Sequence, residues 1–248
     1  TLSFANPLRP DTLPPQTITT IGDLLDDKGV SWAWYAGAWR VALADGMQPP
    51  SAPRRAIYAP MTPAGSPNFQ PHHQPFNYYA DFDPVKHADA RARHLKDYDD
   101  LLVDIAAGHL PAVTFYKPQG NLNQHSGYAS TADGDAHMAE LVARLEASPQ
   151  WPHMLIVITY DEFGGYWDHV PPPKGDLLGP GTRIPALIIS PFSRRGYVDH
   201  SPYDTGSVLR LITHRFDLPL LQGLAMRDAA LKAHGEPPMG DLTAALTF

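Results

Sequence analysis

A run of apolar, mostly β-branched residues from Met154 to Tyr160 constrains the fold more than any other feature of this sequence. A strand that is apolar at successive positions is typically buried on both faces, as in parallel sheets covered by helices. Ala186–Ser190 is a second run of this kind, and strand patterns also occur at Ser31–Tyr35 and Ala112–Tyr116. The sequence therefore predicts an α/β protein with a mostly parallel sheet.

Helical patterns alternate with these strands. We expect a short helix at Ile18–Leu25, one continuous helix over Ala88–Ala107, and a third at Asp135–Leu145 with its apolar residues on one face. A fourth helix is predicted near Val208–Phe216, with Asp204 as its N-terminal cap. This alternation predicts helices on both sides of the sheet, where functional residues gather beyond the carboxyl ends of the strands.

The clearest break in this pattern is a proline-rich, irregular excursion over residues 45–80. Its central part, Pro49–Pro75, contains eight prolines of the 27 in the chain. We expect this stretch to run over the surface, and long loops in compact domains often carry function.

Composition and missing motifs exclude several classes of protein. A net charge of −7 without Lys/Arg clusters argues against nucleic-acid binding, and every apolar run is too short for a transmembrane segment. The absence of cysteine excludes disulfides, thiolate catalysis and cysteine-ligated zinc. The sequence also lacks a Gly-x-Ser-x-Gly elbow, a P-loop, a His-Glu-x-x-His motif and a dinucleotide fingerprint.

Two adjacent carboxylates follow the most apolar strand pattern. Asp161 and Glu162 come directly after Met154–Tyr160, and Gly164 and Gly165 then allow the backbone to turn sharply. Carboxylate oxygens at the end of a strand can converge on one hard divalent cation. A solvated acidic turn is the alternative interpretation of the same residues.

Histidines in two irregular segments form a second group of candidates. His72 and His73 lie between prolines, and His125 lies in a polar loop after the strand predicted at Ala112–Tyr116. Imidazole can bind phosphate oxygens, protonate a leaving oxygen or ligate a metal. Spacing alone leaves structural and functional roles open for these three residues, whereas His214 and most other histidines are expected to be structural.

Several longer motifs, in one order along the chain, resemble the bacterial phosphoesterase family of acid phosphatases and non-zinc phospholipases C. The run TYDEFGGYWDHVPPP (Thr159–Pro173) is similar to the family signature. Further similarity covers Thr20–Trp39, PHHQPFNYY (Pro71–Tyr79), KPQGNLNQHSGY (Lys117–Tyr128) and Tyr203–Phe216. The HHQPFNY and NQHSGY forms look more like the acid-phosphatase branch. The resemblance implies a three-layer α/β/α fold of the alkaline-phosphatase type.

The resemblance also implies a phosphomonoesterase with one divalent metal ion. Asp161 and Glu162 would be the metal ligands, His73 and His125 would contact the phosphoryl group, and His72 would support them. The metal would act as a Lewis acid and the imidazoles would protonate the departing alkoxide, which is consistent with an acidic optimum.

Two further histidines match the family pattern without a defined role. His169 fits either a supporting role near the metal or a packing role, and His200 is expected to be structural.

The sequence departs from the family pattern in lacking the Glu-Asn metal-binding pair that family members carry near their start. We therefore expect residues 1–248 to be the C-terminal part of a single phosphoesterase domain. An N-terminal segment of the same precursor would supply the Ser or Thr nucleophile, and Thr1 is compatible with either processing or degradation. The family resemblance also implies a periplasmic or secreted protein.

Three functions stay open at this level. The first is a metal-dependent acid phosphatase acting on phosphomonoesters together with that N-terminal segment. The second is a phospholipase C that cleaves phospholipid headgroups. The third is a non-catalytic fragment whose acids and histidines are ordinary loop residues.

Overall fold

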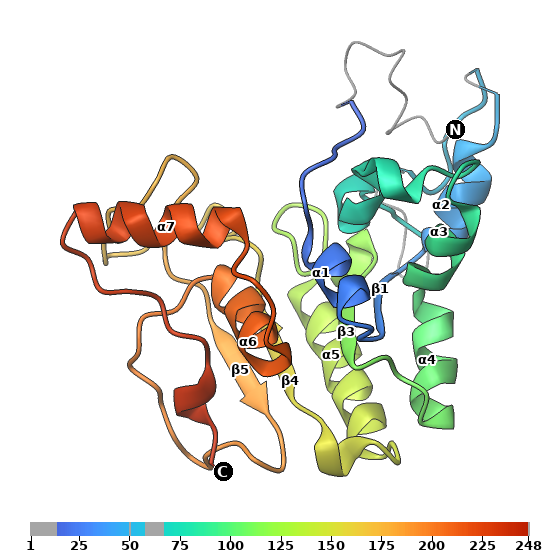
Figure 1. Cartoon of the computed structure of the whole chain (residues 1–248). Helices are drawn as coiled ribbons and strands as arrows, with labels where there is room; N and C mark the ends of the chain where they lie inside the picture. Colours follow the sequence, from blue (N-terminus) through green and yellow to red (C-terminus); the bar gives the residue numbers. More distant parts are fainter. Residues whose placement is uncertain (1–13, 50, 58–66, 248) are drawn as a thin grey trace. The chain divides into compact units, whose positions relative to one another are not determined.

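The computed structural model describes residues 14–49, 51–57 and 67–247 (Figure 1). The chain divides into two compact units, Thr1–Ile18 with Ser31–Pro149 (unit 1) and Thr19–Val30 with Gln150–Phe248 (unit 2). The fold is mixed α/β with a parallel sheet, consistent with the expected three-layer α/β/α class. The α-helices in the described residues are α1 (Ile21–Asp27), α2 (Trp39–Gly46), α3 (Ala88–His94), α4 (Tyr98–Ala107), α5 (Thr131–Glu146), α6 (Gly206–Phe216) and α7 (Gln222–Ala233).

Unit 1 contains a parallel three-stranded sheet in the order β2-β1-β3. Its strands are β1 (Trp32–Ala36), β2 (Leu95–Asp97) and β3 (Val113–Lys117). Trp34 in the central strand is in register with Leu95 on one side and with Phe115 on the other. Because the strands are parallel, the segments that follow Ala36, Asp97 and Lys117 all leave from the same edge of the sheet.

Alternating residues of β1 face two different layers. Ala33 and Tyr35 pack with Leu101 and Ile105 of α4 and Leu141 of α5, and together they form a hydrophobic core. This arrangement explains the apolar faces of α4 and α5 that are visible in the sequence.

The opposite face of the sheet is aromatic. Trp32 stacks on His94 of α3, with ring centroids 4.2 Å apart, and meets Phe82 edge-on at 6.0 Å. Trp34 stacks on Phe115 at 5.2 Å and packs edge-on against Phe76 at 5.8 Å. Helix α3 and short 3-10 turns between residues 71 and 82 therefore cover this face.

The continuous helix predicted over Ala88–Ala107 is wrong. Helix α3 ends at His94, the three residues of β2 pair with β1, and α4 begins at Tyr98. Asp97 caps α4: the backbone N–H of Asp97 donates to Asp100 at 2.9 Å and Asp97 accepts from the N–H of Asp99 at 3.3 Å. Apolar spacing continues through the break, so hydrophobic periodicity does not reveal it.

The proline-rich excursion is only partly a surface segment. Residue 50 and residues 58–66 lie outside the described residues. Within the remainder, the side chains of Phe69, Pro71 and Gln74 are fully buried, and Phe69 lies 5.5 Å from Trp39 of α2, measured between ring centroids. The expectation of an excursion over the surface is therefore wrong for residues 68–77, most of which are buried core.

The first part of the excursion is held by the carboxylate of Asp45, near the end of α2. Oδ2 accepts from the backbone N–H groups of Arg55 at 3.0 Å and of Ala56 and Ile57 at 2.9 Å, and Oδ1 accepts from Arg55 at 3.0 Å. Burial opposes ionisation of Asp45, but these backbone donors together with Arg54 lower its pKa below the ordinary 3.8.

We expect an Asp45→Asn variant to lose about 1–3 kcal/mol of unfolding free energy, because a neutral amide replaces a charged acceptor and its nitrogen cannot accept from the N–H of Arg55 in the place of Oδ1. A lowered folded-state pKa stabilises the protein above the ordinary Asp pKa, and this stabilisation disappears as the pH falls through the folded value. Urea titrations of both proteins should therefore differ at neutral pH and converge as the pH falls through the folded-state pKa of Asp45. Asp83→Asn serves as the control, because Asp83 also accepts from two backbone N–H groups but does so in an exposed turn. An Asp45 variant as stable as that control would contradict the prediction.

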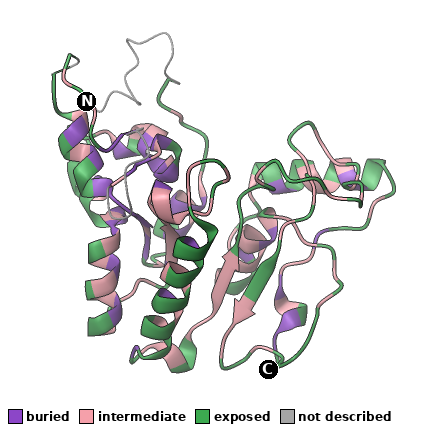
Figure 2. Cartoon of the chain, turned by 180° about the vertical axis from the view of Figure 1, so that it is seen from behind, coloured by how far each residue is buried: buried purple, intermediate pink, exposed green. Residues whose placement is uncertain are grey.

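Unit 2 contains a two-stranded ribbon of β4 (Ile156–Thr159) and β5 (Ala186–Ile189). The strands are antiparallel, with Val157 opposite Ile188. None of their residues is buried (Figure 2). The side chain of Leu187 is 59% exposed. The strands predicted near Met154–Tyr160 and Ala186–Ser190 both exist. The prediction that Met154–Tyr160 is buried in a parallel sheet is wrong, because the strand pairs antiparallel and is not buried. Burial depends on the elements that cover a strand, which its own composition does not specify.

The predicted cap of α6 is also wrong. The helix begins at Gly206 after Thr205, which makes no side-chain capping bond. The carboxylate of Asp204 instead accepts from the Arg227 guanidinium of α7 at 2.7 Å. No helix in the described part of the chain is long and apolar enough to cross a membrane.

Candidate active site

His73 lies at the edge of the sheet where β3 ends. Its Nδ1 is 3.1 Å from the carbonyl oxygen of Pro118, the first residue after β3. The indole N–H of Trp34 in β1 donates to the carbonyl oxygen of His73 at 2.7 Å. The residue is only 2% exposed. Both the ring and the backbone of His73 are therefore fixed by the sheet.

The bond to Pro118 also determines which ring nitrogen carries hydrogen. A carbonyl oxygen can only accept, so Nδ1 of His73 is the donor and Nε2 carries the lone pair in the neutral ring. This is how proteins orient a histidine whose Nε2 exchanges a proton or contacts a ligand.

Close backbone packing holds the Pro118 carbonyl in place. The N–H of Gly37, directly after β1, donates to the carbonyl oxygen of Lys117 at 2.9 Å. A Cβ atom at Gly37 would collide with the backbone nitrogen of Gln119, and one at Gly120 would lie 2.9 Å from the carbonyl oxygen of Asn68. Glycine is therefore required where the chain before His73 meets the loop after β3.

His72 and His125 are more accessible than His73. His72 is exposed, and its ring lies perpendicular to that of His73 with centroids 4.8 Å apart. His125 is exposed in the loop after β3, where it stacks on Tyr128 at 4.3 Å. Its Nδ1 lies 2.7 Å from the carbonyl oxygen of Ser126, so Nε2 is again the lone-pair nitrogen of the neutral ring.

Asp161 and Glu162 belong to unit 2, where they follow Tyr160, the first residue after β4, and are both exposed. Oε2 of Glu162 accepts from the N–H of Gly164 at 2.6 Å. Gly164 and Gly165 have φ angles of 66° and 75°, which confirms the sharp turn expected from the sequence. Two adjacent anionic oxygen donors match the chemistry of a hard divalent cation. Within the described residues, however, no three His, Asp or Glu side chains lie together as a metal site.

A salt bridge anchors the segment that follows the acidic pair. Both carboxylate oxygens of Asp168 accept from the Arg183 guanidinium, at 2.8 Å each. This interaction, with the N–H of Val170, holds the pKa of Asp168 well below its usual range. Nδ1 of the exposed His169 lies 3.8 Å from Asp168, whereas His200 is simply exposed. Sequence reasoning missed Arg183, because its partner lies 15 residues away.

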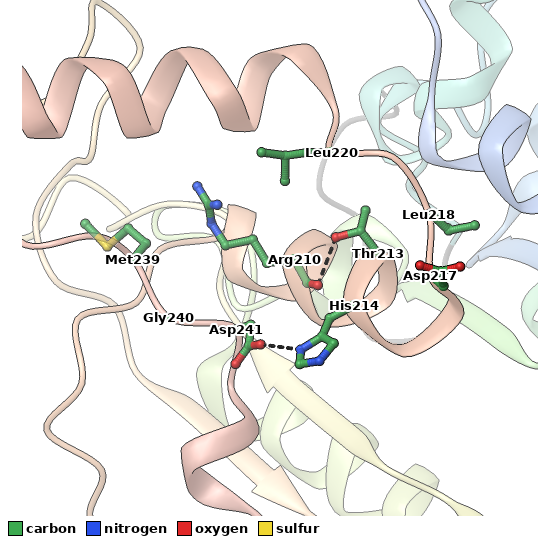
Figure 3. A pocket seen from close by; sticks show the side chains of 9 residues that line it. All are labelled: Arg210, Thr213, His214, Asp217, Leu218, Leu220, Met239, Gly240 and Asp241. Carbon is green, nitrogen blue, oxygen red and sulfur yellow. Dashed lines mark hydrogen bonds and ion pairs between the residues drawn. The ribbon is translucent and has the colours of Figure 1, made fainter.

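Unit 2 also contains an open pocket of about 500 Å³ that sequence reasoning did not find (Figure 3). Nδ1 of His214 lies 2.6 Å from Oδ2 of Asp241 at its wall. His214 was expected to be structural, and its contact with Asp241 spans 27 residues without any local motif. The pocket is lined by Arg210, Thr213, His214, Asp217, Leu218, Leu220, Met239, Gly240 and Asp241.

The fold and these residues define an α/β protein with an oriented histidine beyond a parallel sheet and an acidic pair beyond a second strand. Residues 2–219 match the Phosphoesterase family, and the chain belongs to this family.

Its similar proteins include phospholipases C from bacteria and plants. The chain is 30% identical over 173 residues to phospholipase C B of Mycobacterium tuberculosis, covering 60% of this chain and 32% of that protein. It is 26% identical over 182 residues to the non-hemolytic phospholipase C of Pseudomonas aeruginosa, covering 60% and 25%. It is 42% identical over 86 residues to the non-specific phospholipase C3 of Arabidopsis thaliana, covering 28% and 16%. The matched region thus spans a third or less of each relative.

Proposed function

We propose that this chain is part of a metal-dependent phosphoric ester hydrolase that acts on phosphomonoesters at acidic pH. The observation that carries this proposal is the buried His73 ring, which is held by Pro118 with its Nε2 as the exchangeable nitrogen. Family membership supports phosphoric ester chemistry. The resemblance of the HHQPFNY and NQHSGY motifs to the acid-phosphatase branch favours monoesters over lipids.

In this proposal the two histidine loops handle the phosphoryl group. Protonated His73 donates from Nε2 to a phosphoryl oxygen, and His125 either shares this contact or protonates the departing alkoxide. His72 stabilises the position of His73 through their ring contact. Because these steps need imidazolium, activity is expected to fall as the pH rises.

Asp161 and Glu162 are proposed to hold one divalent metal ion, together with ligands from outside the described residues. The ion would supply Lewis-acid stabilisation of the charge that develops on the phosphoryl group. We further propose that a Ser or Thr nucleophile comes from an N-terminal segment of the same precursor, and that the protein is periplasmic or secreted. The lack of a Glu-Asn pair in this sequence supports the proposal of such an N-terminal segment.

Phospholipase C activity is a second candidate, favoured by the names of the similar proteins. In that case the leaving group is a diacylglycerol and the product is a phosphorylated headgroup. The same histidines and metal would serve both reactions, so the substrate assay decides between them.

The test compares this chain alone with the complete precursor, on p-nitrophenyl phosphate and on phosphatidylcholine, near pH 6 and with added divalent metals. We expect monoester hydrolysis by the precursor, its loss with a chelator, and little activity from the chain alone. Faster headgroup release than monoester hydrolysis would favour the phospholipase. Full activity of the isolated chain would contradict the missing nucleophile, and inactivity of the precursor on both substrates would contradict the proposal.

A further inference from the structure

Two leucines stand at the tip of a tight turn in unit 2. Leu177 is 99% exposed and Leu178 is 90% exposed. The turn is closed by Asp176, whose side chain accepts from the N–H of Leu178 at 2.8 Å and whose carbonyl oxygen accepts from the N–H of Gly179 at 3.3 Å. Single exposed leucines are ordinary, but two adjacent ones on a closed turn form a projecting apolar tip.

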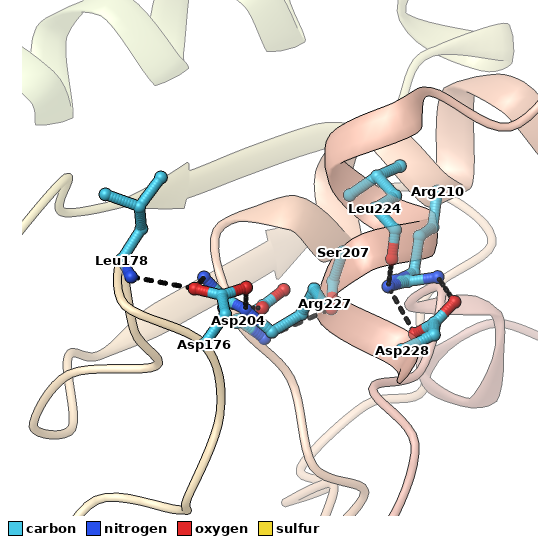
Figure 4. A network of polar contacts seen from close by, with 8 residues as sticks. All are labelled: Asp176, Leu178, Asp204, Ser207, Arg210, Leu224, Arg227 and Asp228. Carbon is cyan, nitrogen blue, oxygen red and sulfur yellow. Dashed lines mark hydrogen bonds and ion pairs between the residues drawn. The ribbon is translucent and has the colours of Figure 1, made fainter. Parts of the chain in front are cut away.

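An ion-pair network fixes this turn to the helices of unit 2 (Figure 4). Nε of Arg227 in α7 donates to Asp176 at 2.7 Å, and another guanidinium nitrogen donates to Asp204 at 2.7 Å. The side chains of Arg227, Asp176 and Asp204 are 16%, 23% and 9% exposed. The network holds the turn, and its single guanidinium is shared between the two carboxylates.

Backbone N–H groups of the turn already have hydrogen-bond partners within the protein, which lowers the cost of removing the turn from water. The N–H groups of Leu178 and Gly179 already have intramolecular partners, and Pro180 has no N–H. Backbone donors without partners are what prevents most loops from entering an apolar phase. The N–H groups of Leu178 and Gly179 therefore keep their hydrogen bonds when the tip is desolvated.

The surroundings of the turn favour a lipid surface. Between Val170 and Arg183, Asp176 is the only acidic residue in the sequence, and it shares Arg227 with Asp204. Lys174 is exposed, and Arg183 is paired with Asp168. The Asp168–Arg183 salt bridge ties this loop to the segment carrying Trp167, which is 85% exposed. Tryptophan is enriched where proteins meet the interface of a bilayer.

We propose that the 176–179 turn docks this protein on a phospholipid surface by inserting Leu177 and Leu178 among the lipids. A projecting tip needs no matching cleft in a fluid surface, and the exposed Trp167 suits the interface of a bilayer. Docking requires no turnover, so it can be tested independently of the proposed hydrolysis.

The first test measures co-sedimentation of the full chain with vesicles of phosphatidylcholine and phosphatidylglycerol in equal parts. We expect Leu177→Ser/Leu178→Ser to weaken binding by at least about tenfold, since apolar burial of one leucine corresponds to roughly that factor. Val85→Ser is the control, because Val85 is 82% exposed in unit 1. Unchanged binding of the double variant, or equal weakening by the control, overturns the proposal.

The second test uses the absence of cysteine in this chain. Gly181→Cys places a single environment-sensitive label beside the tip, and Gly223→Cys places the same label on α7. An added Cβ meets no heavy atom within 4 Å at either position. Vesicles should shift the emission of the label at 181 to the blue and leave that at 223 unchanged. No shift at 181, or dimer formation that depends on the leucines without vesicle binding, overturns lipid docking in favour of a protein partner or none.

Discussion

An Asp161→Asn/Glu162→Gln double variant is expected to lose bound divalent metal and to hydrolyse phosphate esters at least about 100-fold more slowly than the unmodified protein. Neutral amides are much weaker ligands for a hard cation than carboxylates. The exchange preserves shape, and the amide oxygen of the introduced glutamine can still accept from the N–H of Gly164 as Glu162 does. Metal content after chelation and reloading, measured with the hydrolysis rate, checks the prediction.

Asp26→Asn/Asp27→Asn provides the matched control for this variant. These two residues are adjacent, acidic and exposed in α1, so the substitution removes the same charge from the same unit. If both double variants keep their metal and activity, Asp161 and Glu162 form only a solvated acidic turn.

His73→Asn is expected to leave the fold intact and to reduce hydrolysis by at least about 100-fold. The Asn amide nitrogen occupies the place of Nδ1 and can still donate to the Pro118 carbonyl, while the Nε2 position is lost. His73→Gln offers the opposite replacement, since its longer side chain reaches toward Nε2. The melting temperature and the hydrolysis rate of each variant, measured together, separate folding from catalysis.

His109→Asn is the control for this prediction, because His109 is exposed in unit 1 beyond the end of α4. Activity of the His73→Asn variant equal to that of the control would remove His73 from the reaction. Loss of both stability and activity would instead assign it a role in packing.

The local elements of this protein are largely readable from the sequence. The strands at β1, β3, β4 and β5 and the helices α1 and α5 lie within a few residues of their predicted places. Asp97 and Asp100 do carry a signal for the break before α4, because an acidic cap followed by a second acid three residues later marks a helix start. The stronger apolar periodicity around them conceals it.

Long-range relations could not be predicted in this way. The burial of Phe69 and Gln74 depends on aromatic partners and backbone that are distant in sequence, so their proline-rich surroundings misled the prediction. The hydrogen bond that orients the His73 ring joins residues 45 positions apart in the sequence. The sequence therefore predicts which side chains are candidates, whereas their anchoring by Pro118, Trp34 or Arg183 requires the folded chain.

The partly exposed β4–β5 ribbon has a practical consequence for work with this chain. Within the described residues each strand pairs with one other strand, so its second edge presents backbone N–H and C=O groups that can template pairing with further strands. Such edges make edge-to-edge aggregation a hazard at high protein concentration. Binding and activity measurements should therefore be made on dilute, freshly fractionated protein, and a charged substitution at Leu187, which is 59% exposed, is a rational way to improve its solubility.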